Sequence, residues 1–357
     1  RIGSRTELNE LIKQMIGELG ASHTYIWGGK LHPREEAVPI GVGLLGADLA
    51  ADGGAVVIQR ILPPQPYDKR GVSPLAASHL NIQPGAVLRA INGQAVAPGV
   101  NPYELLQDQA GKPVRLTVAD DARGANERTV TVEPIGSESR LRYLAWVDDN
   151  RRAVAEATDG RVGYIHIPDM GGNGLSMFSR QFFPQWRMPA IVIDVRYNGG
   201  GFVSQMILRR LDRDVLSYDQ PRHGAVSRYP YRAPDAHFAC LINQQAGSDG
   251  DIFPASFRRA GLGPLIGMRT WGGVIGIRGD KPFVDLGLST QPEFAYWDER
   301  GWVIENEGVR PDEEVPLTPA DSAAGRDPQL DRAIEYLMQK LEAAPKQDPA
   351  PPPYPNR

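Results

Sequence analysis

Residues 244–253, which read QQAGSDGDIF, constrain the fold of this chain more than any other stretch. An apolar run typical of a β-strand, residues 237–243, precedes them, and a segment with helical character follows them. Because glycines surround Ser248, the chain can turn sharply there from strand to helix. Such a turn would lift the Ser248 hydroxyl out of a sheet and direct free N–H groups of the helix toward the group that the serine attacks. The simpler interpretation is a helix-capping serine in an ordinary loop.

The composition is that of a globular protein with a sizeable core: of 357 residues, 41% are hydrophobic and 23% are charged. This length predicts two or three domains. The formal net charge of −4, with scattered arginines and lysines, predicts no nucleic-acid and no membrane partner, and no segment approaches the length of a membrane span. The single cysteine, Cys240, cannot form an internal disulfide, which fits a reducing compartment, so we expect a cytoplasmic protein.

Hydrophobic periodicity and turn signals divide the chain into four parts. Residues 1–37 carry a helical stripe but are too few to fold alone, so we expect them to join a mixed α/β domain. Residues 38–135 contain short alternating strands with hairpin and turn signals, which predict a mostly-β unit. Residues 136–345 alternate strand-type and helix-type segments, typical of an α/β domain with a largely parallel sheet. Residues 346–357 form a proline-rich tail that we expect to be disordered.

Two helices carry specific expectations. Residues 6–19 have the apolar stripe of an amphipathic helix, with Thr6 as its N-cap and Gly20 at its end, and this stripe must pack on some other part. Residues 101–110, inside the mostly-β unit, read as a short helix.

Residues 41–46 read GVGLLG and match the letters G-x-G-x-x-G of a dinucleotide-binding loop. That site needs a strand before the glycines and a helix after them. Here the preceding residues are not of strand type, and a β pattern broken by turns follows. The sequence therefore predicts no nucleotide site, and we expect no cofactor and no metal.

A second glycine-rich stretch, residues 190–202, reads AIVIDVRYNGGGF and ends a buried strand in three glycines. Three glycines let the backbone approach a ligand closely and point N–H groups at it. No Lys-Ser/Thr pair follows, which excludes a Walker loop. If this strand lies beside the strand before Ser248, a glycine N–H and the Asp249 N–H would flank the serine hydroxyl, because ligands of α/β sheets bind at the carboxyl ends of the strands. Two such donors form an oxyanion hole.

A serine nucleophile needs a base to accept its proton, and histidine is the commonest one. The six histidines are His23, His32, His79, His166, His223 and His237. Two of them lie in apolar strands, one belongs to the mostly-β unit, and two occupy loops without other signals. The remaining one, His23, stands beside Ser22 at the end of the N-terminal helical segment. Spatial neighbours cannot be read from the residues alone, so at this point His23 is one candidate among six.

Residues 38–135 resemble a PDZ domain. The resemblance lies in GVGLLGADL at residues 41–49, in NIQPGAVLRAINGQAV at residues 81–96 and in the final strands. In PDZ domains a glycine-rich loop before the binding strand offers backbone N–H groups to the terminal carboxylate of a peptide. The resemblance implies that residues 43–46 form that loop here.

Four elements occur in a specific order: Ser22-His23, DVRYNGGGF, AGSDGDIF, and VIENEGVRPD at residues 303–312, with the PDZ-like part between the first and the second. This order resembles the C-terminal half of the tricorn proteases, over nearly the whole chain. The resemblance implies an α/β catalytic domain, with a sheet and helices like those of crotonases and C-terminal processing peptidases, and an inserted mostly-β PDZ-like domain. Tricorn proteases carry two β-propellers before this half, which the present sequence does not contain.

The resemblance also assigns roles within a Ser-His-Ser-Glu tetrad. Ser248 would be the nucleophile, His23 the general base, Ser22 the residue that orients the imidazole, and Glu305 the residue that holds Ser22. Glu307 is the alternative to Glu305, because residues two apart in a strand face the same side. For either glutamate, a solvated loop charge is the simpler interpretation.

For the substrate, the resemblance implies oxyanion N–H groups from Gly201 and Asp249, with Gly200 beside them in the substrate-binding loop. The family prefers a basic residue on the acyl side of the cleaved bond, held by an acidic residue beyond the glycine loop. Asp219 is the first choice for that residue. The alternatives are Asp212 and Asp214.

The related C-terminal processing peptidases share the PDZ domain and the sheet but use a Ser/Lys pair, whose lysine follows a G-x-x-T-x-G pattern. Residues 267–272 fit that pattern, but the next residue is Gly273. The side chain of a lysine base is therefore missing, which favours His23 for the proton transfer.

Together these features predict a serine endopeptidase of tricorn type that cleaves short peptides, such as proteasome products, through an acyl-enzyme. The resemblance implies a hexamer for the full-length protein. Two alternatives stay open: a PDZ-containing C-terminal processing peptidase, and a non-catalytic module whose PDZ-like domain captures peptide C-termini.

Overall fold

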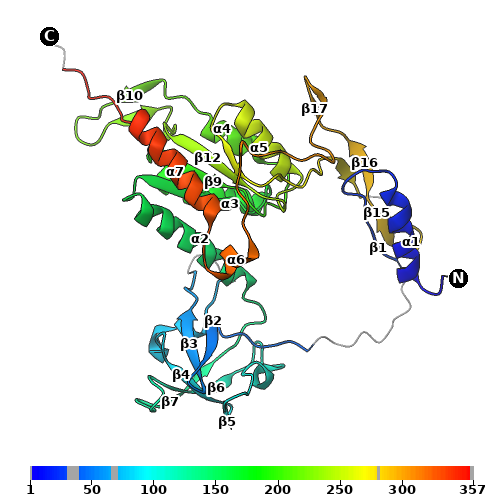
Figure 1. The fold of residues 1–357 in the computed structure, drawn as a ribbon, viewed down its shortest axis with the longest axis vertical. Coiled ribbons are helices and arrows are strands. Elements are labelled where there is room, and N and C mark those ends of the chain that lie inside the picture. The colour runs from blue at the N-terminus through cyan, green and yellow to red at the C-terminus, as the bar shows by residue number, and fades with distance from the viewer. Residues whose placement is uncertain (1, 30–39, 66–70, 280–281, 354–357) are drawn as a thin grey trace. The chain divides into compact units, whose positions relative to one another are not determined.

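The computed structural model divides into two compact units (Figure 1). The described residues are 2–29, 40–65, 71–279 and 282–353. The first unit joins Arg1–Arg34 to Asn150–Arg357, and the second spans Glu35–Asp149. Within the described ranges, no helix is both long and apolar enough to cross a membrane.

A five-stranded parallel sheet forms the centre of the first unit. Its strands, in spatial order, are β19 (Glu313–Glu314), β13 (Leu265–Gly267), β12 (His237–Ile242), β9 (Ala190–Asp194) and β8 (Val162–His166). Every residue of β8, β9 and β13 is buried, as expected for parallel strands that read as continuous apolar runs. Because β9 and β12 are direct neighbours, the glycine loop after β9 and the serine turn after β12 leave the same edge of the sheet.

Helices pack against this sheet and against one another: α3 (Gly172–Gln185), α4 (Ser204–Leu211), α5 (Asp249–Arg259) and α7 (Pro328–Ala343). The short α6 (Pro319–Ala323) precedes α7 and has no buried residue. α7 crosses β12 and β9, and α4 packs against α5 (Figure 1). α5 starts directly after Ser248, so the predicted strand-to-helix turn at residues 244–253 is confirmed.

The N-terminal helix, α1 (Arg5–Gly17), is capped by Ser4 and not by Thr6 as expected. Ser4 has the extended backbone that a cap needs (φ −146°, ψ 160°), and its side chain accepts the Glu7 N–H. Thr6 already lies inside the helix. The apolar stripe of α1 stays largely exposed, with Met15 at 65%.

Polar contacts rather than apolar burial hold α1. Asn9, its one buried residue, donates to a carbonyl of β1 (Ile26–Gly28) at 3.1 Å, and Arg5 pairs with Asp285 at 2.5 Å. β1 in turn pairs antiparallel with β15 (Gly287–Ser289). The other short antiparallel pairs of this unit are β10 (Ser217–Asp219) with β11 (Ser227–Tyr229), β14 (Gly276–Arg278) with β16 (Gln291–Phe294), and β17 (Trp297–Asp298) with β18 (Gly301–Trp302).

The second unit is built on an antiparallel sheet with the strand order β2-β3-β4-β6-β7, and β5 pairs with β4. The strands are β2 (Ala47–Asp52), β3 (Ala55–Ile61), β4 (Val87–Ile91), β5 (Gln94–Ala95), β6 (Val114–Ala119) and β7 (Arg128–Val132). The 3-10 helices η1 (Pro74–Ala76), η2 (Ser78–Leu80) and η3 (Glu104–Leu106) and the start of α2 (Ser139–Ala157) complete it.

The short helix expected over residues 101–110 is reduced to η3. Val42 forms a β-bridge with Gln107, and the Gly43 N–H donates to the Leu106 carbonyl at 2.8 Å. These tertiary contacts take backbone groups that a longer helix would use for itself, so the expected helix was wrong in length.

Lys346 and Asp348 lie in the stretch that was expected to form a disordered tail. Lys346 pairs with Asp235, and Asp348 with the buried Arg228, each at 2.6 Å. The start of this stretch is thus held against the first unit.

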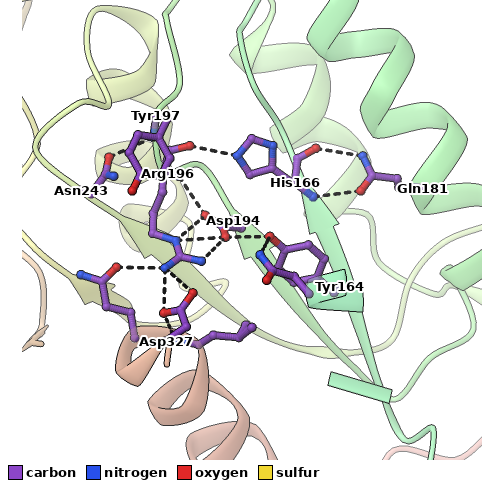
Figure 2. Close-up of polar contacts among 11 residues, drawn as sticks. Tyr164, His166, Gln181, Asp194, Arg196, Tyr197, Asn243 and Asp327 are labelled. Atoms are coloured by element: carbon purple, nitrogen blue, oxygen red, sulfur yellow. Dashed lines mark hydrogen bonds and ion pairs between the residues drawn. The ribbon is translucent and has the colours of Figure 1, made fainter. Parts of the chain in front are cut away.

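A buried polar network lies at the end of β9, just before the glycine loop (Figure 2). The Arg196 guanidinium, 1% exposed, binds Asp194 at 2.7 Å and the α7 N-cap Asp327 at 2.8 Å. The Tyr164 hydroxyl donates to the same Asp194 at 2.8 Å. Burial alone would raise the pKa of Asp194, but the Arg196 charge and its hydrogen bonds lower it instead. The network fixes the backbone from which the glycine loop emerges.

Removing Asp194 should strongly destabilise the first unit. Asp194→Ala leaves the Arg196 guanidinium buried and short of a partner, and breaking a buried pair in this way costs about 3–5 kcal/mol. The control is Glu10→Ala, which removes an exposed ion pair with Lys13 and should cost less than about 1 kcal/mol. Urea denaturation at neutral pH, where the lowered pKa keeps Asp194 ionised, measures both losses. Equal losses would contradict the prediction.

Candidate active site

Ser248 occupies the turn between β12 and α5 with a strained backbone (φ 62°, ψ −123°). Residues other than glycine are rarely found there, and such strain is concentrated at functional sites. The Ser248 carbonyl accepts the N–H groups of Asp251 and Ile252 at 2.8 and 3.1 Å, so the first turn of α5 starts at the serine itself. Its side chain caps no N–H group of the helix. Ser248 thus occupies the N-cap position of α5, but its side chain does not make the hydrogen bond of a helix-capping serine.

The glycine loop packs directly against Ser248. A Cβ on Gly200 (φ 77°) would lie 2.5 Å from the Ser248 Cβ, and a Cβ on Gly201 (φ 147°) would lie 2.0 Å from the Met170 carbonyl oxygen. Both contacts are far shorter than any real Cβ makes, so only glycine fits at these two positions. The loop thereby brings its backbone within reach of anything bound to the serine.

Two backbone N–H groups beside Ser248 meet no acceptor in the described part of the chain: those of Gly201 and Asp249. The Gly200 N–H, by contrast, donates to Asn198 Oδ1 at 2.9 Å. Asp249 is the first residue of α5, where a helix leaves N–H groups unpaired and its dipole favours an anion. The structure thus leaves both expected oxyanion donors open, whereas Gly200 serves the close contact with Ser248.

Ser22, His23 and Glu305 form one hydrogen-bonded cluster. Glu305 accepts the Ser22 hydroxyl at 3.0 Å and the Ser22 N–H at 2.7 Å. The Ser22 Oγ lies 3.2 Å from His23 Nδ1. Glu305 Oε2 also accepts the N–H groups of Val274 and Ile275, at 2.7 and 3.1 Å. The carboxylate therefore ties the N-terminal segment to the loop before β14.

The Ser22 hydroxyl fixes which nitrogen of His23 carries the proton. A hydroxyl has one hydrogen, and an ionised carboxylate can only accept, so this hydrogen points to Glu305. The Ser22 oxygen then accepts the Ile275 N–H at 3.3 Å and the N–H of His23 Nδ1. In the neutral imidazole the opposite nitrogen, Nε2, then carries no hydrogen and can take a proton, as a general base requires.

The structure separates Glu305 from its alternative, Glu307. Residues 303–308 form turns, because the N–H groups of Glu307 and Gly308 both return to the Ile304 carbonyl, at 2.9 and 2.7 Å. The expected strand is therefore wrong, and the two glutamates do not share a side. Glu305 is half-buried against its donors, whereas Glu307 is exposed.

Trp271 contacts both His23 and the turn that carries Ser248. Its ring meets the His23 ring edge-on, with 5.3 Å between centroids, and a Cβ on Gly247 would lie 2.7 Å from its indole. The Trp271 N–H donates to the Ala246 carbonyl at 2.9 Å. His23 and the turn that carries Ser248 therefore contact the same indole. Among the described residues no hydrogen bond joins Ser248 to His23 directly, and such bonds often tighten only when substrate binds.

Sequence reasoning missed Asp251, which holds the loop that carries Trp271. The buried Asp251 carboxylate accepts the N–H groups of Gly272 and Gly273, at 2.8 and 3.2 Å. Burial raises the pKa of Asp251, and its hydrogen bonds oppose that rise. In the sequence, an aspartate in the first turn of a helix is typical of a dipole contact, so nothing distinguishes this one.

Position 273 has no room for a lysine. A Cβ on Gly273 would lie 2.3 Å from the Trp271 ring. The glycine after the G-x-x-T-x-G pattern is thus required by the indole that contacts His23. This packing agrees with the expectation that a lysine base is missing here.

The other histidines lie elsewhere. His166 and His237 each bond through Nε2 to a backbone carbonyl, at 2.9 and 2.7 Å. His79 belongs to the second unit, and His223 lies between β10 and β11. His32 falls outside the described residues.

Asp219 does not lie beside Ser248 within one chain. It stands on the exposed β10, and Arg187 anchors the hairpin through the carbonyl just before β11, at 2.6 Å. Because Arg187 precedes β9, this hairpin lies at the amino edge of the sheet, whereas Ser248 lies at the carboxyl edge. A cavity of about 390 Å³ at the amino edge is lined by Asp212 and Asp214. None of the three aspartates therefore contributes to the site within one chain.

Comparison with known proteins finds a family match in both parts of the chain. Residues 161–315 match Peptidase family S41, and residues 43–137 match the Tricorn protease PDZ domain. "Tricorn protease homolog 1" of Streptomyces coelicolor is 42% identical over 98% of this chain and 32% of that protein. "Tricorn protease" of Thermoplasma acidophilum is 38% identical over 95% of this chain and 31% of that protein.

The fold has a matching solved structure. The crystal structure of the tricorn protease superimposes with a TM-score of 0.88 at 38% identity, and covers 96% of this chain and 33% of its own. The present chain therefore spans about a third of the length of the tricorn proteases that it matches.

One methyl group added to the glycine loop at residue 200 should slow any peptide hydrolysis about 100-fold, whereas one at residue 199 should not. The Gly200→Ala methyl must displace Ser248, and a misplacement of about 1 Å costs about 100-fold in rate. Gly199→Ala is the matched control, because a Cβ there meets nothing within 4 Å. Hydrolysis of a fluorogenic peptide measures the rates, and melting temperatures show whether both variants fold. A folded Gly200→Ala variant with full activity would contradict the geometry.

Proposed function

Because the chain carries a serine peptidase domain of family S41 and a tricorn protease PDZ domain, which makes it a relative of the tricorn proteases, we propose that it is a tricorn-type endopeptidase of short peptides. Ser248 is the nucleophile, and His23, Ser22 and Glu305 complete the catalytic tetrad. The observation that carries this proposal is the Ser22 hydroxyl, which bonds to Glu305 and leaves His23 Nε2 free.

In the proposed mechanism, the Ser248 oxygen attacks the peptide carbonyl carbon while His23 Nε2 takes the hydroxyl proton. The imidazolium that forms keeps its orientation through Ser22, whose hydroxyl hydrogen remains directed at Glu305. His23 then gives the proton to the leaving amine as the carbon–nitrogen bond breaks. A water molecule, deprotonated by the same nitrogen, hydrolyses the Ser248 ester and regenerates the hydroxyl.

The oxyanion of each tetrahedral intermediate is held by the N–H groups of Gly201 and Asp249. Both are unpaired among the described residues, and neither has to move away from an internal acceptor before it binds the oxyanion. The Asp249 donor also sits at the positive end of α5. One such donor contributes about 100- to 1,000-fold to the rate.

Two features weigh against the alternatives. The absence of a side chain at Gly273 and the packing of Trp271 over that position disfavour the Ser/Lys mechanism of C-terminal processing peptidases. The strained Ser248, its open N–H donors and the ordered Ser22-His23-Glu305 cluster would serve no purpose in a purely binding module.

The finer assignments rest on the resemblance to the tricorn family and on the single cysteine. We include in the proposal that the substrates are short peptides such as proteasome products, that the full-length protein is a hexamer, and that it acts in the cytoplasm. The proposal does not include a contact between Asp219 and a substrate bound at Ser248 of the same chain, because the β10–β11 hairpin lies at the opposite edge of the sheet.

Ser248 should react with a fluorophosphonate probe only when His23 is present. In the parent chain, peptide mapping should find the label on Ser248. His23→Ala removes the proton acceptor and should slow labelling about 100- to 10,000-fold. His166→Ala is the control, because that imidazole is bound to the Arg196 carbonyl, and it should label at the parent rate if folded. An unlabelled parent, or labelling that survives His23→Ala, would refute the assigned pair.

The two glutamates should differ sharply when changed to glutamine. Glu305→Gln turns a group that accepts four hydrogen bonds into one that must also donate, which disturbs Ser22 and should lower kcat about 100-fold or more. Glu307→Gln is the matched control at an exposed site and should change kcat less than about 2-fold. Steady-state peptide hydrolysis measures both. A reversed order would exchange the roles of the two residues.

A further inference from the structure

In the second unit, the loop that was expected to hold a peptide carboxylate has most of its N–H groups already bonded within the chain. The Gly43 N–H donates to the Leu106 carbonyl and the Leu44 N–H to the Ile135 carbonyl, each at 2.8 Å. The Gly46 N–H donates at 2.7 Å to the side chain of Glu138. The expectation that residues 43–46 present their N–H groups to a ligand is therefore wrong for these three groups, because each already has an internal acceptor.

Glu138 is placed as the carboxylate of a bound peptide would be. Its side chain is 5% exposed, with one oxygen on the Gly46 N–H and the other on Arg142, at 2.9 Å to Nε and 2.6 Å to Nη2. Arg142 also pairs with Asp48 at 2.6 Å. A backbone N–H and a guanidinium are the donors that a terminal carboxylate seeks, and here both are bound to a carboxylate of the chain itself.

A groove lies farther along β2, and its lining residue Tyr103 is near enough for the Glu138 charge to act on its hydroxyl. A cavity of about 360 Å³ lies between β2 and residues 97–103 and is lined mostly by alanine, glycine and proline. Tyr103 lines it, and burial raises the pKa of its hydroxyl, with the nearby Glu138 charge raising it further. β2 is the first strand of its sheet and pairs with β3 alone among the described strands, so its other edge is open to an added strand.

We propose that this groove binds an extended internal segment of a peptide as a strand added to β2, and that it does not read peptide C-termini, because Glu138 occupies the carboxylate position. Charge favours an internal segment over a peptide C-terminus. Glu138 and Asp48 would repel a terminal carboxylate placed near Gly46, whereas the uncharged backbone of an internal segment would meet no such repulsion. Small lining residues leave width for a narrow extended chain. The inference does not depend on which residues carry the catalysis, and only the Ser248→Ala background of its test rests on the proposed function.

The test compares two forms of one probe. A fluorescein-labelled decapeptide rich in alanine and valine is prepared with a free C-terminal carboxylate and as the C-terminal amide. Both are titrated by fluorescence anisotropy with the full chain carrying Ser248→Ala, which prevents cleavage. We expect both forms to bind with affinities within about twofold of each other, because neither terminus is read.

Removing the Glu138 carboxylate should create a preference for the probe with a free C-terminal carboxylate. Glu138→Ala, added to the Ser248→Ala chain, frees the Gly46 N–H and Arg142, and the free-acid probe should then bind about tenfold or more tighter than the amide. Glu138→Gln keeps the position filled and should retain equal affinities. Glu127→Ala removes an exposed glutamate of the same unit outside the groove and serves as the control for charge alone.

Three results would overturn the proposal. One is a tenfold preference for the free acid in the Ser248→Ala chain, which would show that a peptide carboxylate displaces Glu138 from the Gly46 N–H and Arg142. Another is the failure of that chain to bind either probe, which would show that the groove takes no peptide. The third is a folded Glu138→Ala variant without any preference for the acid. If Glu138→Ala does not fold, the comparison of acid and amide in the Ser248→Ala chain still decides.

Discussion

The Glu305 carboxylate is the contact on which the arrangement of the candidate site depends. It binds Ser22, 283 positions away in the sequence, and at the same time the N–H groups of Val274 and Ile275. Hydrogen bonds to a charged group contribute about 1.5–3 kcal/mol each, which is enough to hold a segment whose helix has an exposed apolar stripe. The same contact sets the direction of the Ser22 hydroxyl, so position and chemistry come from one interaction.

Several residues near the Glu305 carboxylate and Ser248 have strained backbones. Ser248, His23, Ile304 and Asn306 all have positive φ, a conformation that costs residues other than glycine about 1–3 kcal/mol each. Compensation comes from tight packing and hydrogen bonds: the glycine loop against Ser248, Thr290 on the His23 carbonyl at 2.6 Å, and the Asn306 N–H on the Gly272 carbonyl at 2.7 Å. Residues of the candidate site are thus held in backbone conformations that an isolated loop would leave.

What the sequence could predict follows from the range of each interaction. The parallel strands, the turn at Ser248 and the glycine loop depend on neighbouring residues, namely apolar runs and glycines with their backbone freedom. All three were therefore predicted from the sequence. Glu305, Asp251 and Glu138 act on partners that lie 283, 21 and 92 positions away, so neither their roles nor the turn around Glu305 could be read from neighbouring letters. Ser22 and His23 were linked to Ser248 only through the resemblance to a family.

The two glycine-rich loops show why letters alone do not define an anion site. Both stretches, GVGLLG and NGGG, have the backbone freedom to present N–H groups. Near Ser248 the N–H groups of Gly201 and Asp249 have no acceptor among the described residues, whereas in the second unit that of Gly46 is bound to Glu138. A buried N–H must find an acceptor, so the deciding question is whether the chain itself supplies one. Beside Ser248 no described residue supplies one, and because Gly201 is exposed its N–H stays accessible to a ligand, such as the oxyanion that an attack by Ser248 would place there.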